Sequence, residues 1–170
     1  MSRPHLGILC LILGLGVGGC AHPRADAVST LYLVRHAEKA KGDDPELTEA
    51  GRQRADDLAD LLTARLEEGD LSAIYSTEYR RTQQTAAPLA ARSGVVVQSY
   101  DPRDLPGFAQ QLSGQGGTVL IVGHSNTTPQ LAEALGCGPQ EPIVEATEYD
   151  RLYRVERGAE TVCMIERFGR

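Results

Sequence analysis

The chain has 170 residues, of which 41% are hydrophobic and 24% charged, and its formal net charge is −6. This composition is ordinary for a soluble globular protein, and the length suggests one domain that can bury a core. The negative charge argues against nucleic acid as a partner because such binding needs a basic surface, although a local arginine cluster can still hold a small anion.

The first residues have the features of an export signal. An apolar run over residues 6–17 follows a short start that contains Arg3. The run is too short for a membrane-spanning helix, which takes about 20 residues. The next residues complete the tetrapeptide VGGC over 17–20, which resembles the lipobox of bacterial lipoproteins and implies cleavage before Cys20 with lipid attached to it. Ordinary cleavage after Ala27, where the sequence reads Ala-Asp-Ala, is the alternative.

We therefore divide the chain into a signal peptide over 1–19, a polar tether over 20–29 and one domain over 30–170. We expect an exported, monomeric protein that is periplasmic and anchored to a membrane only through lipid at Cys20. A soluble periplasmic or secreted protein is the alternative.

Strand-like and helix-like segments alternate along the domain. Apolar runs rich in strand formers predict strands, and amphipathic stretches predict helices. In chain order we expect a strand over 30–34, a loop over 39–45, a helix over 48–66 capped by Thr48, a strand over 71–76, a helix over 78–92 that Pro88 kinks or restarts, a strand over 94–98, a helix over 104–112 capped by Asp104, a strand over 118–122, a helix with Pro129 in its first turn that ends before Gly136, and a hairpin over 152–156 and 161–166.

This alternation predicts an α/β fold, namely a three-layer α/β/α sandwich with a largely parallel mixed sheet. The final hairpin would add antiparallel strands to it. Only Cys137 and Cys163 lie in the domain. An oxidising periplasm would allow them to pair, but the sequence does not give their separation, and we expect two unpaired structural cysteines. Their spacing fits no metal site, and we expect no metal and no cofactor.

Three polar clusters follow predicted strands, over residues 35–38, 76–85 and 123–126. Sites in open α/β sheets form beyond the carboxyl ends of the strands. His36 and His124, the only histidines of the domain, both stand at such ends. Imidazole is a competent nucleophile near neutral pH, and arginine suits the oxygens of a transferring phosphoryl group. One histidine could therefore attack phosphorus while the other and two arginines hold the oxygens, a scheme that does not require a metal.

The segments LVRHAEK, YRRTQQTA and VGHSN carry a resemblance to the three core motifs of the histidine phosphatase superfamily, also called phosphoglycerate mutase-like. The resemblance implies a phosphoglycerate mutase-like fold with His36 as the nucleophile that becomes phosphohistidine. It also implies that Arg35 and His124 bind the phosphoryl group, and we expect Ser125 to bind substrate beside them. The family pattern places its second arginine four residues before a threonine, in an R-x-x-Q-T stretch, so the resemblance implies Arg81 rather than Arg80 as the second phosphate-binding arginine.

The chain departs from the family pattern mainly in the proton donor to the leaving group. Many members carry a glutamate for this step, and none matches clearly here. Asp101 is the first candidate because it follows the third strand, although the Asp-Pro pair also reads as a turn. Asp104 and Glu148 are the alternatives, and Glu38 is expected to orient the arginines.

The function expected from these residues is a phosphatase acting on a small phosphorylated substrate or a phosphoprotein. A non-catalytic module that binds a phosphorylated ligand is the alternative. A phosphoglycerate-type mutase is a further one, but the short connection from Arg81 to His124 leaves little room for the lid that a mutase needs.

Overall fold

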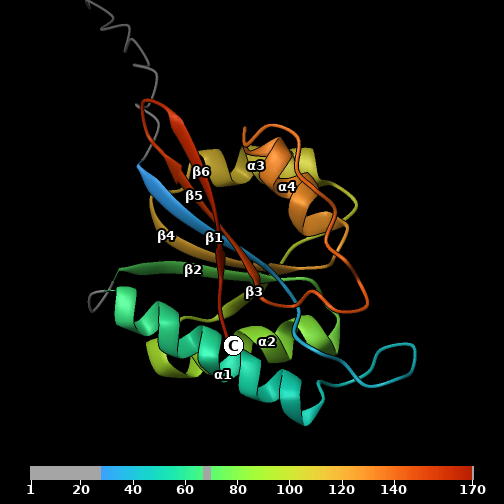
Figure 1. The fold of residues 1–170 in the computed structure, drawn as a ribbon. Helices are drawn as coiled ribbons and strands as arrows, with labels where there is room; N and C mark the ends of the chain where they lie inside the picture. Colours follow the sequence, from blue (N-terminus) through green and yellow to red (C-terminus); the bar gives the residue numbers. More distant parts are fainter. Residues whose placement is uncertain (1–27, 67–69, 170) are drawn as a thin grey trace, which may run out of the picture.

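The computed structural model describes residues 28–66 and 70–169 (Figure 1). The predicted signal peptide, Cys20 and almost all of the tether lie outside this part of the chain. The elements are β1 (Ser29–Arg35), α1 (Glu49–Arg65), β2 (Leu71–Ser76), α2 (Arg80–Ser93), β3 (Val97–Ser99), α3 (Leu105–Ser113), β4 (Gly117–Gly123), α4 (Thr127–Ala134), β5 (Arg151–Arg157) and β6 (Thr161–Arg167). Within the described ranges, none of the helices has the length and apolar character that crossing a membrane requires.

The six strands form one sheet in the order β3-β2-β4-β1-β5-β6. The first four strands pair in parallel, whereas β5 runs antiparallel to β1 and continues into the β5–β6 hairpin. This confirms the predicted mixed sheet. In the β1–β4 register Arg35 pairs with Gly123, so the residues that follow these two strands emerge at the same edge.

Helices cover both faces of the sheet, which gives the predicted three layers (Figure 1). Leu31 and Leu33 of β1 pack on the face covered by α3 and α4, whereas Tyr32 and Val34 pack on the face covered by α1 and α2. The alternation follows from the two-residue period of a strand. Because β1 is buried on both faces, its sequence is a continuous apolar run.

Two predicted helix caps are confirmed. The Thr48 side chain accepts a hydrogen bond from Gly51 N at 3.1 Å, and the Asp104 carboxylate accepts one from Gly107 N at 3.0 Å. Both satisfy backbone N–H groups that have no partner within their helix. The possibility that Pro88 restarts a helix is wrong, because α2 runs through it without a break.

The third strand begins later than predicted, at Val97 instead of residue 94. Gly94 caps α2 with φ 72°, a left-handed conformation that favours glycine, and its N–H bonds to Ala90 O. Residues 94–96 therefore belong to the turn out of the helix, and Val96 is exposed.

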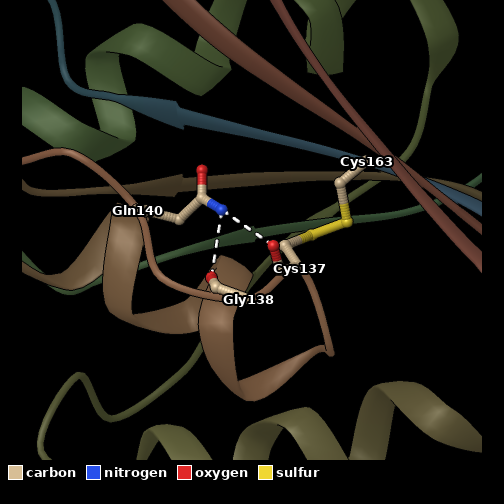
Figure 2. Close-up of a disulfide and its surroundings, with 4 residues drawn as sticks. All are labelled: Cys137, Gly138, Gln140 and Cys163. Carbon is tan, nitrogen blue, oxygen red and sulfur yellow. Dashed lines mark hydrogen bonds between the residues drawn. A yellow bond between two sulfur atoms is a disulfide. The ribbon is translucent and has the colours of Figure 1, made fainter.

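The expectation of two unpaired cysteines was wrong. Cys137, just beyond α4, forms a disulfide with Cys163 of β6, and their Cα atoms are 5.6 Å apart (Figure 2). Gln140 folds back beside the bond, donating from Nε2 to the carbonyls of Cys137 and Gly138 at 3.0 and 3.1 Å (Figure 2). The pairing depends on where the chain after α4 meets the edge strand, which the spacing of cysteines in the sequence does not reveal.

Candidate active site

The candidate site lies where β1 and β4 end side by side. The backbone N–H of His36, directly after β1, donates to Gly123 O at 2.9 Å. This bond extends the β1–β4 pairing by one step and brings the rings of His36 and His124 to 5.6 Å between centroids. The two histidines that stand 88 positions apart in the sequence are thus neighbours at one edge of the sheet.

The ring of His36 is held in one orientation. Its Nδ1 lies 2.7 Å from Ala37 O. A carbonyl only accepts, so Nδ1 carries the hydrogen and the lone pair of the neutral ring lies on Nε2. Burial lowers the pKa of His36 to about 3, and the nearby charges of Arg35, His124 and Arg81 also lower it. Near pH 7 the ring is therefore neutral, with Nε2 free to act as a nucleophile.

Arg35 is almost fully buried beside His36, with 2% of its surface exposed. Its Nη1 donates to Glu145 O at 2.8 Å and Glu148 O at 3.1 Å, and its Cζ lies 4.0 Å from the ring centroid of Tyr149. Its buried Nε has no hydrogen-bond partner in the part of the chain described. A buried cationic donor without a partner is costly, so this group suits an anionic ligand.

The structure separates the two neighbouring arginines as the R-x-x-Q-T spacing predicts. The Arg81 side chain is 13% exposed and stacks on Tyr79, with Cζ 4.3 Å from the ring centroid. Its Nη1 is 3.7 Å from Asp44, and its buried Nε, like that of Arg35, lacks a partner among the described residues. Arg80 is 57% exposed and pairs with Glu46 outside the site.

His124 lies beside His36, directly after the end of β4. Its Nε2 lies 3.1 Å from Thr77 Oγ1, and its ring meets Tyr79 edge-on at 5.2 Å. Burial lowers its pKa to about 4, with Arg81 and Arg35 contributing. Ser125 follows in the turn that leads to α4 and is partly buried. Near neutral pH, His124 is thus an uncharged side chain that can donate to or accept from a ligand.

None of the three candidate proton donors is arranged for that role. Asp101 is exposed and binds Arg103 through both carboxylate oxygens, and these hydrogen bonds lower its pKa to about 2. Asp104 caps α3. Glu148 binds Arg151 and Arg167, and although burial opposes it, these bonds and one from Val144 N leave its pKa below the usual range. All three carboxylates are engaged, and neither Asp101 nor Glu148 retains a proton near pH 7.

Glu38 has a different role from the one expected. It accepts hydrogen bonds from Arg54 Nε and Nη2 at 2.8–3.0 Å, rather than orienting Arg35 and Arg81. Arg54 also donates to Phe168 O and Gly169 O. Glu38 therefore connects the segment after His36 to α1 and to the end of the described chain.

Sequence reasoning missed three side chains that touch the core residues. Thr77 and Tyr79 lie within the second motif cluster and contact His124, so their position was a usable signal. Tyr149, on which Arg35 stacks, lies in the irregular segment between α4 and β5. That segment carries no motif, and only the folded chain brings it to the site. Within residues 28–66 and 70–169, no three His, Cys, Asp or Glu side chains gather as a group that could hold a metal ion.

Residues 31–103 match the family model of the histidine phosphatase superfamily (branch 1). The matched part contains Arg35, His36 and Arg81, and ends before His124. No curated protein matches the chain.

Solved structures resemble the whole domain. The protein histidine phosphatase SixA, complexed with tungstate, has a TM-score of 0.65 at 17% identity, with 81% of this chain and 96% of that chain covered. The SixA protein from Agrobacterium tumefaciens gives 0.59 at 24%, covering 81% and 97%. A mycobacterial glucosyl-3-phosphoglycerate phosphatase gives 0.62 at 17%, covering 81% and 97%.

At these identities the likeness establishes the fold, which is that of phosphoglycerate mutase-like proteins. The family model thus matches the part of the chain that carries Arg35, His36 and Arg81, and the likeness to solved phosphatases extends the shared fold over the remainder of the domain.

Proposed function

We propose that this protein is a phosphatase that hydrolyses a phosphomonoester or phosphoramidate through a phosphohistidine on His36. One observation carries the proposal. The Nδ1 of His36 is occupied by Ala37 O, which leaves Nε2 free, while Arg35 and Arg81 each keep a buried Nε without a partner among the described residues. A nucleophile with two unused cationic donors nearby suits an incoming phosphoryl group.

The reaction proceeds in two displacements. The lone pair of His36 Nε2 attacks phosphorus, and the bond between phosphorus and the leaving group breaks with its electron pair. Arg35, Arg81, His124 and Ser125 hold the phosphoryl oxygens. Water then attacks the phosphohistidine and loses a proton to solvent. The P–N bond breaks with its electron pair returning to Nε2, inorganic phosphate departs, and His36 returns to its neutral form.

None of the three candidate donors is arranged to protonate the leaving group, since Asp101 and Glu148 are bound to arginines and Asp104 caps α3. We therefore expect a strong dependence on leaving-group pKa. Among aryl phosphates, kcat/KM should fall steeply as the pKa of the phenol rises, because little protonation offsets the developing charge. A nearly flat dependence, measured by phosphate release, would instead require a proton donor in the site.

Trapping of labelled phosphate tests the central step. Rapid acid-free denaturation during turnover should leave label on the wild-type protein and none on His36→Ala, which should also lose hydrolysis of an aryl phosphate. Equal hydrolysis by both proteins would refute the proposal. Phosphate binding without turnover across a broad panel would favour the binding module, and isomerisation of phosphoglycerate without phosphate release would favour a mutase.

We also propose that the protein is exported and lipidated at Cys20. The apolar run over 6–17 and the VGGC tetrapeptide support this. The Cys137–Cys163 disulfide is consistent with it, because such bonds persist in oxidising compartments. Mass spectrometry of the mature N-terminus should find a lipid-modified Cys20, whereas an unmodified start at Val28 would point to ordinary cleavage after Ala27.

A further inference from the structure

A cavity of about 640 Å³ opens at the carboxyl ends of β2 and β3, beside the phosphoryl pocket. Its volume falls in the range of small-molecule sites, roughly 300–1,000 Å³. The end of β3 and the residues that follow β2 and β3 line it, together with Asp44 from the loop before α1. We propose that this cavity receives the leaving group of the substrate and selects groups that are uncharged or positively charged. This inference rests on the proposed phosphatase function.

Shared walls connect the cavity to the phosphoryl pocket. Thr77 and Tyr79 line the cavity, and both also contact His124. On the same side, Arg81 stacks on Tyr79 and faces Asp44. A group attached to a phosphoryl held by Arg81 and His124 can therefore extend over Tyr79 into this space.

The charges of the cavity oppose those of the phosphoryl pocket. Three carboxylates line it, those of Asp44, Glu78 and Asp101, against the single guanidinium of Arg103. Asp101 neutralises Arg103 at 2.8 Å, and Asp44 faces Arg81 at 3.7 Å. Glu78 is exposed and has no ion-pair partner in the described chain. The net charge of the lining is thus negative next to a positive phosphoryl pocket.

This separation of charge selects among substrates by the charge of their leaving group. The phosphoryl end meets Arg35 and Arg81, while a carboxylate or second phosphate on the leaving group would meet Glu78 and repel it. An ammonium group would be attracted. Tyr79, Tyr100 and Pro102 add apolar lining that suits an organic ring or chain. The chemistry therefore favours a neutral or cationic organic phosphate over a polyanionic metabolite.

Three phenyl phosphates test the inference, bearing a trimethylammonium, a methyl or a carboxylate substituent at the same ring position. In wild type we expect kcat/KM to favour the cationic over the anionic compound. Glu78→Gln should lower this ratio by about two- to fivefold, the size of a partly solvated unit charge, and Arg103→Gln should raise it by a similar factor. The three phenols also differ in reactivity as leaving groups, but this difference is the same for every protein. It therefore cancels when the ratio of a variant is divided by the ratio of wild type.

Glu160→Gln is the matched control. It changes the net charge as Glu78→Gln does, but it lies in the β5–β6 turn, at the opposite end of the sheet from the site. Its ratio should equal that of wild type, and 0.5 M salt should shrink the Glu78→Gln effect. The inference would be overturned, with the proposed function intact, if the kcat/KM ratio shifted equally in Glu160→Gln. It would also be overturned if the ratio stayed unchanged in both Glu78→Gln and Arg103→Gln. Failure of wild type to release phosphate from all three compounds would overturn the proposed function as well.

Discussion

Arg80 and Arg81 are adjacent in the sequence, yet α2 directs them to different surroundings. Successive helical residues point about 100° apart, so only one of the two can face the site. Arg81 is stacked on Tyr79 and close to both histidines, and Arg80 pairs with Glu46 in solvent. Helical phase therefore decides which of the two arginines lies beside the histidines.

A paired substitution tests this assignment. Arg81→Ala should reduce kcat/KM for an aryl phosphate by about 10²- to 10³-fold, the usual loss on removing one charge-stabilising donor. Arg80→Ala should stay within about twofold of wild type, since exposed ion pairs contribute little. Steady-state kinetics with circular dichroism as a fold control would decide. Similar losses in both variants would show that α2 does not separate the two roles.

At the scale of elements, the segment between α4 and β5 positions Arg35. The carboxylate of Glu148 binds Arg151, Arg167 and Val144 N, which holds the segment in a fixed shape. The carbonyls of Glu145 and Glu148 then accept from Arg35. Glu148 therefore affects Arg35 through the backbone that its carboxylate holds in place. A carboxylate near the site suggested a proton donor from the sequence, but the contacts of Glu148 indicate a structural role.

Glu148→Gln should weaken phosphoryl binding through Arg35. We expect KM for an aryl phosphate to rise about fivefold or more, because two charge-assisted bonds of roughly 1.5–3 kcal/mol each are replaced by neutral ones. Glu141→Gln is the control, since only the Glu141 carbonyl accepts from Arg151. A change in the pH dependence of kcat with unchanged KM would instead indicate that Glu148 transfers a proton.

At the scale of the whole molecule, the disulfide joins the chain after α4 to the edge strand β6. It closes a loop with a sequence separation of 26 residues. In the chain-entropy description, such a link stabilises the folded protein by about 3.5 kcal/mol. The double variant Cys137→Ser/Cys163→Ser should show a lower urea midpoint by a corresponding amount. A midpoint equal to that of the oxidised wild type would mean that the bond adds no stability.

The buried histidines should also make stability depend on pH. Their folded pKa values of about 3 for His36 and about 4 for His124 lie below the value of about 6.5 in an unfolded chain. Between pH 6.5 and 4.5 the unfolded chain therefore binds protons that the folded protein does not, and stability falls as the pH falls.

Urea unfolding between pH 7 and 4.5 measures this effect. The loss should be on the order of 1 kcal/mol per histidine per pH unit below 6.5. His124→Asn should show a shallower decline than wild type, because one of the two groups is gone. Parallel declines in both proteins would assign the acid sensitivity to other groups.

The sequence alone determined the features that depend on local spacing. Apolar runs fixed the strands of the sheet, Thr48 and Asp104 marked helix starts, and the polar clusters marked the strand ends at which Arg35, His36 and His124 lie. The R-x-x-Q-T spacing of the family resemblance selected Arg81 over Arg80, and its phosphate-binding role stays a prediction. The predictions of strands, helix starts and strand ends succeeded because strand and helix periods act over a few residues, and parallel strands place their carboxyl ends at one edge.

Only the tertiary structure decided the contacts made across long separations. The pairing of Cys137 with Cys163, the contact of Tyr149 with Arg35 and the anchoring role of Glu148 all depend on how an irregular segment crosses the end of the sheet. Asp101 follows β3 as predicted, but its hydrogen bonds with Arg103 lower its pKa and make it unsuited to donate a proton. Such contacts leave no repeating pattern in the sequence, because they join segments that are far apart along the chain and meet only when the protein folds.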